Sequence, residues 1–208
     1  MNIVLRRTSP FLFLICILNI PLGCNKPGAS HSNSTEEREN TVESMSKEAQ
    51  YGLGQVAPDF ELPDLNGEMV SLSSLKGNPV VIHFATTWCP FCNAEAPYLE
   101  QLFQDYQSQG VKVLIVDVKE PEELVREKLQ NKFNFSFPLL IDLDGEVANR
   151  YCPPEAQPAL ARDEVMIASN LLIDSEGNIQ FFSLLDSEGF DAKLTELKAR
   201  LDEMLASN

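Results

Sequence analysis

The sequence contains few of the residues that hold metal ions or nucleic acids. Only two of its 208 residues are histidine, and its five cysteines include only one pair at Cys-x-x-Cys spacing. Structural zinc sites usually need a second such pair or nearby histidines, so we expect neither a metal nor another cofactor. Basic residues number 16 against 31 acidic ones, giving a net charge of −15. Because lysine and arginine carry most nucleic-acid affinity, nucleic acid is not an expected partner.

The sequence also lacks an apolar run long enough to cross a bilayer comfortably as a helix. Residues 11–20 form a shorter run after Arg6–Arg7, which is the pattern of an export signal. This signal ends at Pro21–Cys24, which resembles a bacterial lipobox, although Pro21 stands where a lipobox usually has leucine. We therefore expect Cys24 to be lipidated and to anchor the protein to a membrane. The alternative is ordinary signal cleavage, which would leave Cys24 a thiol.

Polar residues dominate positions 25–50, where serine, asparagine, glutamate and lysine are frequent. Such a segment cannot bury enough apolar surface to offset the entropy lost on ordering, so it is expected to be a flexible tether. No internal repeat is visible in the remainder. The sequence thus predicts a signal peptide with a lipobox over residues 1–24, a disordered tether over 25–50 and one globular domain over 51–208.

The globular part alternates short apolar runs with amphipathic stretches. Strands are predicted at residues 79–85, 111–117 and 138–141, after a hairpin of 57–62 with 68–72 and before a hairpin of 170–173 with 179–183. Helices are predicted at 95–107, 121–132, 146–151 and 190–205. Strands that alternate with helices are typical of parallel βαβ units. The expected fold class is therefore α/β, with a central mixed sheet flanked by helices.

The stretch Trp88–Cys92 (Trp-Cys-Pro-Phe-Cys) lies between a predicted buried strand and a predicted helix. Two cysteines three positions apart at a helix start can form a disulfide, with the first expected to be exposed and the second to face inward. The helix N-terminus favours the thiolate of Cys89, so Cys89 is the predicted nucleophile and Cys92 the residue that resolves a mixed disulfide. Pro90 suits the first helical turn, and Trp88 is expected to shield the pair from water.

Two other uses of a cysteine pair fit this sequence less well. Haem attachment requires a histidine directly after the second cysteine, and Asn93 stands there. A structural disulfide is the remaining alternative in an exported protein. The place of the pair between a buried strand and a helix favours redox chemistry over that alternative.

Residues 54–205 resemble the TlpA/ResA-like branch of membrane-anchored, thioredoxin-like proteins. The matching stretches are Ala57–Phe60, Leu72–Gly77, Ala85–Cys92, Glu95–Pro97 and Leu172–Gly177. The pattern Trp-Cys-Pro-x-Cys-x-x-Glu-x-Pro is the specific part. The resemblance implies a thioredoxin-like fold with an N-terminal β-hairpin extension. It also implies a thiol-disulfide oxidoreductase that reduces disulfides of exported proteins and receives electrons from an upstream thiol donor.

By this resemblance, Glu95 is a buried carboxyl group that tunes the cysteine pair and relays protons, and Pro97 kinks the helix. Physical reasoning supports the role of Glu95, because it follows Cys92 by three residues on the same helix face. A desolvated carboxyl group there would have a raised pKa suited to proton transfer. The alternative is an exposed glutamate in the first turn, favoured by the helix dipole.

Two positions depart from the family pattern. Ala168 stands where the family has a cis-proline, in a loop that abuts the cysteines and receives substrate, and we expect a trans peptide bond there. His83 lies six residues before Cys89, where related proteins carry Asp or Asn. It is either a core histidine with satisfied hydrogen bonds or a second proton acceptor near Cys92.

The connection at residues 152–164 is longer than the family's usual one and contains several prolines. It is predicted to be a stiff loop beside the active site. Cys152 at its start is either a buried thiol or a third redox residue.

Two other protein classes share this fold and remain alternatives. Peroxiredoxins share the Ala57–Phe60 opening and the Thr86-x-x-Cys89 spacing, but the proline of their motif would fall at Ile82. Their peroxide-activating arginine would fall near Ala168, with Arg162 as a candidate replacement. Copper chaperones of the Sco type use a longer cysteine spacing and a downstream histidine, and no histidine follows His83.

Overall fold

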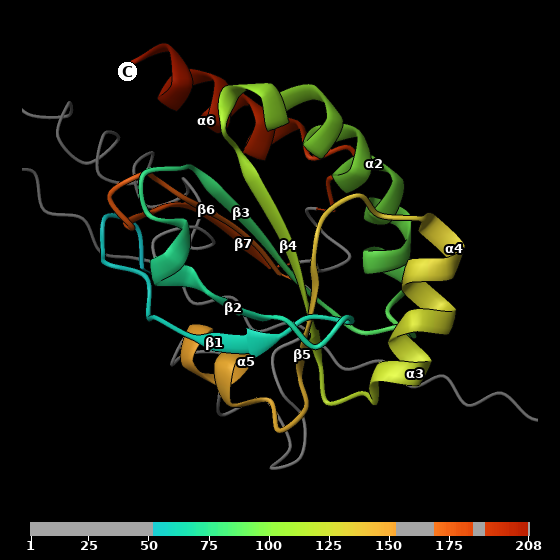
Figure 1. Cartoon of the computed structure of the whole chain (residues 1–208). Helices are drawn as coiled ribbons and strands as arrows, with labels where there is room; N and C mark the ends of the chain where they lie inside the picture. Colours follow the sequence, from blue (N-terminus) through green and yellow to red (C-terminus); the bar gives the residue numbers. More distant parts are fainter. Residues whose placement is uncertain (1–51, 153–168, 185–189, 208) are drawn as a thin grey trace, which may run out of the picture. The chain divides into compact units, whose positions relative to one another are not determined.

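The computed structural model describes residues 52–152, 169–184 and 190–207, and its centre is a five-stranded mixed sheet (Figure 1). The strands lie in the order β5-β4-β3-β6-β7. They are β3 (Val80–Ala85), β4 (Lys112–Val118), β5 (Leu139–Asp142), β6 (Ser169–Ile173) and β7 (Ile179–Leu184). β3, β4 and β5 are parallel, whereas β6 runs antiparallel to its neighbours β3 and β7. This arrangement confirms the expected α/β class with a mixed sheet.

Helices and a short hairpin cover the two faces of the sheet. The long helices α2 (Pro90–Tyr106) and α6 (Thr195–Ala206) pack on one face (Figure 1). The other face carries α5 (Glu146–Tyr151) and the predicted hairpin, β1 (Glu61–Pro63) with β2 (Met69–Ser71). The shorter pieces are the 3-10 helices η1 (Leu72–Leu75) and η2 (Gln107–Gln109), and α3 (Glu122–Val125), a π-helical turn (Arg126–Gln130) and α4 (Asn131–Phe133) after β4.

β3 is buried at all six positions, which explains why its sequence is an almost unbroken apolar run. Its side chains alternate between the two faces, so Val81 and Ala85 belong to the core cluster under α2 and α6. Ile82 and Phe84 belong to the cluster on the opposite face. His83 shares the α2 face, because it lies between Val81 and Ala85 in this alternation. β3 thus places one polar side chain directly beneath the helix that carries the cysteines.

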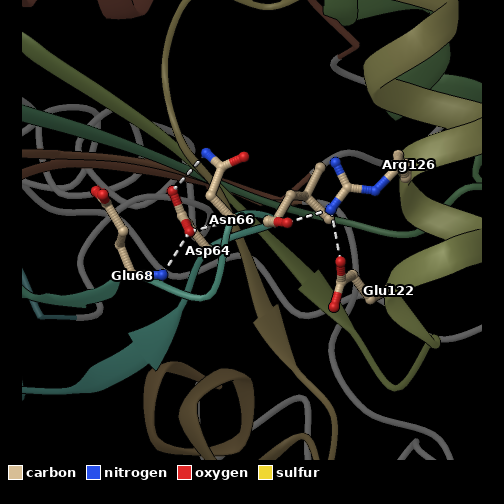
Figure 2. A network of polar contacts seen from close by, with 6 residues as sticks. Asp64, Asn66, Glu68, Glu122 and Arg126 are labelled. Atoms are coloured by element: carbon tan, nitrogen blue, oxygen red, sulfur yellow. Dashed lines mark hydrogen bonds and ion pairs between the residues drawn. The ribbon is translucent and has the colours of Figure 1, made fainter.

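A network of polar contacts ties the β1–β2 turn to the helical segment after β4 (Figure 2). The Asp64 carboxylate accepts the backbone N–H groups of Asn66 (2.8 Å) and Glu68 (2.9 Å), which closes the turn. The Arg126 guanidinium donates to the backbone carbonyl of Leu65 in that turn and to the Glu122 carboxylate. These contacts fix the hairpin against the helical segment that follows β4.

The predicted elements are confirmed in kind, but several differ in bounds or geometry, and the first hairpin strand, predicted over 57–62, is only Glu61–Pro63. α2 begins at Pro90 instead of at residue 95, because Cys89 already acts as its N-cap. The helix predicted over 121–132 contains a π-helical turn. The last helix begins at Thr195 instead of at residue 190. Its start is set by Asp191, whose carboxylate accepts the backbone N–H groups of Thr195 and Glu196.

The predicted leader lies outside the described residues. The signal peptide and lipobox over residues 1–24, the Cys24 anchor and the tether over 25–50 therefore stay predictions. Among the described residues, no helix combines the length and the apolar character needed to cross a membrane.

Replacing Leu99 tests how strongly α2 is held against the sheet. Leu99 is fully buried in the α2-face cluster, so Leu99→Ala removes apolar contacts and leaves a cavity. We expect the free energy of unfolding to fall by about 2–5 kcal/mol in denaturant titration. The matched control is Leu143→Ala, because Leu143 is 65% exposed. The control should change the free energy by less than about 0.5 kcal/mol. Equal losses in the two variants would contradict this packing.

Candidate active site

The two cysteines lie at the start of α2, where the carboxyl end of β3 turns into the helix. Cys89 is the N-cap, and its Sγ accepts the backbone N–H of Cys92 at 3.2 Å. Pro90 occupies the first helical turn, as predicted. Cys89 is only 5% exposed and Cys92 2%, so the prediction that the first cysteine is exposed is wrong. Burial of Cys89 follows from its place in the α2-face core cluster, beside Ala85.

The surroundings of the two sulfur atoms move their pKa values in opposite directions. Hydrogen bonds from the Cys92 thiol and from the backbone N–H groups of Cys92 and Phe91 lower the pKa of Cys89 to about 6. The hydrogen bond to Cys89 and burial raise the pKa of Cys92. At neutral pH Cys89 is therefore mainly a thiolate and Cys92 a thiol, as the predicted roles of nucleophile and resolving residue require.

The turn before the cysteines is held by side chains from two other parts of the chain. The Glu120 carboxylate accepts both the backbone N–H (2.5 Å) and the hydroxyl (2.7 Å) of Thr87. The Asn93 amide donates to the carbonyls of Thr87 (2.9 Å) and Cys89 (2.8 Å). Lys132 in turn donates to the Asn93 carbonyl oxygen at 2.8 Å. These contacts fix the backbone conformation that places the Cys89 sulfur at the helix end.

Glu95 is buried at 1% exposure, which contradicts the alternative of an exposed first-turn glutamate. Asn170 of β6 donates its amide N–H groups to both Glu95 carboxyl oxygens, at 3.1 and 3.0 Å. Burial, aided by the negative charges of Asp191 and Cys89, raises the pKa of Glu95 to about 8. Glu95 is accordingly protonated in most molecules at neutral pH, and a modest change in nearby charge can ionise it.

His83 combines features of both interpretations made from the sequence. Its Nδ1 lies 2.7 Å from the Asn170 amide oxygen and 3.4 Å from a Glu95 oxygen. Burial lowers the pKa of His83 to about 4, so the ring is neutral at neutral pH. Since the amide oxygen can only accept, Nδ1 carries the proton and Nε2 carries the lone pair. Nε2 is buried and has no hydrogen-bond partner among the described residues.

Of the other predicted site residues, one lies near the pair, one lies apart from it, and the rest lie outside the described residues. Trp88 directly precedes Cys89 and is 67% exposed, and its shielding of the pair stays a prediction. Cys152 is a buried thiol in the core cluster of the opposite sheet face, so the structure does not bring it to the pair. Ala168 and the loop over 153–164, including Arg162, lie outside the described residues. In the part of the chain that the structure describes, no cluster of metal-ligating side chains occurs.

Four polar residues of the site were not predicted: Asn93, Asp117, Glu120 and Asn170. Asn170 faces His83 directly across the antiparallel β3–β6 pair. A polar residue at the start of an otherwise apolar strand was the one available signal for it. Asp117 pairs with Ala85 across β3 and β4, and Glu120 follows it in the next turn. Their approach to the cysteine turn depends on strand register, which local sequence patterns do not specify.

Comparison with known proteins matches residues 53–182 to the family model described as AhpC/TSA family. The thiol-disulfide oxidoreductase ResA of Geobacillus thermodenitrificans is 42% identical over 99 residues, which are 48% of this chain and 56% of that protein. ResA of Bacillus cereus is 30% identical over 135 residues, 65% of this chain and 71% of that protein. The chain thus spans little more than half the length of the first of these relatives.

Solved structures share the fold. A putative protein disulfide isomerase from Bacteroides thetaiotaomicron superimposes with a TM-score of 0.61 and 27% sequence identity. The match covers 78% of this chain and 95% of that chain. The thioredoxin-like fold with an N-terminal hairpin, expected from the sequence, is therefore confirmed.

Replacing Glu95 should change how stability depends on pH. Its carboxyl group has a folded-state pKa of about 8, above the ordinary value of 4.5. The native state therefore holds an extra proton between these values, and its stability falls as pH rises through that window, by at most about 1.4 kcal/mol per pH unit. Glu95→Gln should remove this part of the slope in denaturant titrations across pH. The exposed Glu123→Gln should keep it, and a slope retained in Glu95→Gln would contradict the assignment.

Proposed function

This chain belongs to the AhpC/TSA family, and we propose from its likeness to proteins named thiol-disulfide oxidoreductase ResA that it reduces disulfides of exported proteins. One observation carries the proposal. The Cys89 sulfur caps α2 and accepts the Cys92 N–H, with a buried glutamate one turn further along the helix. This geometry gives a reactive thiolate, a resolving thiol and a proton acceptor in one place.

In the first step, the Cys89 thiolate attacks one sulfur of a substrate disulfide. A bond forms between Cys89 and that sulfur, and the other substrate sulfur leaves as a thiolate that takes a proton from water. Free N–H groups at the start of α2 stabilise the attacking thiolate. Exposed Trp88 lies next to Cys89 and offers an apolar surface on which a protein substrate can rest.

In the second step, Cys92 must lose its proton and attack the Cys89 sulfur. The negative charge of Cys89 is one cause of the raised pKa of Glu95, and that charge disappears once Cys89 is in the mixed disulfide. Glu95 then loses its proton to water more readily, and the resulting carboxylate takes the proton of Cys92. Cys92 attacks the Cys89 sulfur and displaces the substrate thiolate. The two cysteines are then joined in a disulfide, which an upstream thiol donor reduces.

We also propose that the protein acts outside the cytoplasm and is held at a membrane by a lipid on Cys24. The apolar run at residues 11–20 and the following lipobox-like stretch support export and lipidation. The tether over 25–50 would let the domain reach disulfides in neighbouring proteins.

Replacing the nucleophile tests the proposed reaction. Cys89→Ser should abolish reduction of insulin or of a model disulfide, because serine does not form a comparable nucleophile at neutral pH. Cys92→Ser should instead trap a mixed disulfide with the substrate, visible on a non-reducing gel. The control is Cys152→Ala, which lies on the opposite face of the sheet and should retain the parent rate. Reduction by Cys89→Ser at the parent rate would refute the mechanism.

Replacing His83 tests whether the buried ring contributes to proton transfer. Its Nδ1–H donates to Asn170, which in turn donates to Glu95, so the ring strengthens the hydrogen bonds that favour the Glu95 carboxylate. Asparagine is too short to preserve this contact. His83→Asn should therefore shift the pH–rate profile of disulfide reduction to higher pH by about half a unit to one unit. Circular dichroism checks that the fold is intact, and an unchanged profile would remove His83 from the mechanism.

A further inference from the structure

Glu120 is a buried carboxylate that the proposed reaction does not use. It is 7% exposed and makes two short hydrogen bonds to Thr87, one to the backbone N–H at 2.5 Å and one to the hydroxyl at 2.7 Å. Thr87 lies two residues before Cys89, in the turn from β3 to α2. Glu120 is thus the contact through which the β4–α3 turn reaches the turn that carries the nucleophile.

The backbone before Glu120 has an unusual conformation. Lys119 has a φ of 60°, in the left-handed region that residues other than glycine seldom occupy. Its backbone N–H donates to the carbonyl of Asp142 at 3.0 Å, which secures this turn to the end of β5. Such a conformation has a cost and persists when the surrounding structure enforces it. Here it directs the next side chain toward Thr87.

Asp117 is fully buried near the end of β4 and interacts with Glu120. Its carboxyl oxygens accept no hydrogen bond from the described residues, whereas the protonated carboxyl group hydrogen-bonds to Glu120. Burial first, and the negative charge of Glu120 second, raise the pKa of Asp117 to about 9. Asp117 is therefore neutral at neutral pH.

We propose that Glu120 is a positioning residue for Cys89: by holding Thr87 it keeps the cysteine sulfur aligned with the N–H groups at the start of α2. The proposal rests on the proposed function, because it takes Cys89 to be the nucleophile. Glu120 acts through geometry and not through its charge. A negative charge alone would disfavour the nearby thiolate, whereas correct alignment with the N–H groups favours it.

Two substitutions separate geometry from charge. Glu120→Gln removes the charge, but its amide can still accept the Thr87 N–H and donate to the Thr87 hydroxyl. Glu120→Ala removes both contacts. The exposed Glu123→Ala in the first turn of α3 is the matched control.

The measurement is the thiol pKa of Cys89 in the reduced full-length protein. It is obtained from the pH dependence of alkylation by iodoacetamide, with the modified cysteine identified by peptide mass. We expect Glu120→Ala to raise this pKa by about one unit, because the sulfur loses aligned donors. Glu120→Gln and Glu123→Ala should stay within about half a unit of the parent.

Each outcome decides the proposal. An unchanged pKa in Glu120→Ala would overturn it, even if the variant unfolds more easily, because Glu120 would then be merely structural. A lowered pKa in both Glu120 variants would also overturn it, since charge would then be the cause. Alkylation needs no disulfide substrate. A raised pKa in Glu120→Ala alone would therefore support the positioning role even if the protein failed to reduce disulfides.

Discussion

The hydrogen bond from the Cys92 backbone to the Cys89 sulfur is the contact on which the chemistry of this site depends. It exists because β3 ends where α2 begins, so that a cysteine takes the place of the usual N-cap residue. The unpaired N–H groups of the first helical turn then stabilise a negative sulfur in a place that is otherwise almost dry. Without those groups, burial alone would raise the pKa of Cys89 and suppress its reactivity.

Burial has the opposite effect on the groups deeper in the site. Cys92, Glu95 and His83 are all nearly inaccessible to solvent, and each is driven toward its neutral form. At rest the α2 face therefore carries little charge besides the Cys89 thiolate. When that thiolate is consumed, the negative charge near Glu95 is lost and the Glu95 carboxyl group ionises more easily. The low polarity of the site makes its pKa values depend on the redox state of the cysteines.

The sequence was sufficient to predict features that depend on neighbouring residues. The strands, the hairpins and the place of Trp88–Cys92 at a helix start follow from local patterns of apolar residues, whereas the burial of Glu95 was implied by the family resemblance. The burial of Cys89 and the roles of Asn170 and Glu120 could not be predicted in this way. Asn170 is 87 positions from His83, and Glu120 is 33 from Thr87. These contacts arise from strand register and from a left-handed residue in a turn, which no local pattern encodes.

His83 and Asn170 occupy directly opposed positions of β3 and β6. The His83 Nδ1–H donates to the Asn170 amide oxygen, so each residue provides the partner that a buried polar group of the other needs. If His83 were replaced by an apolar residue, the Asn170 amide oxygen would lose its donor. If Asn170 were replaced by an apolar residue, the His83 Nδ1–H would lose its acceptor. Either single change would leave a buried polar group without a partner, which costs about 1–3 kcal/mol. The two residues therefore constrain each other, and Glu95 depends on both through the Asn170 amide. The buried histidine of β3 is thus accommodated by a partner on a distant strand, and the same partner holds the Glu95 carboxyl group in place.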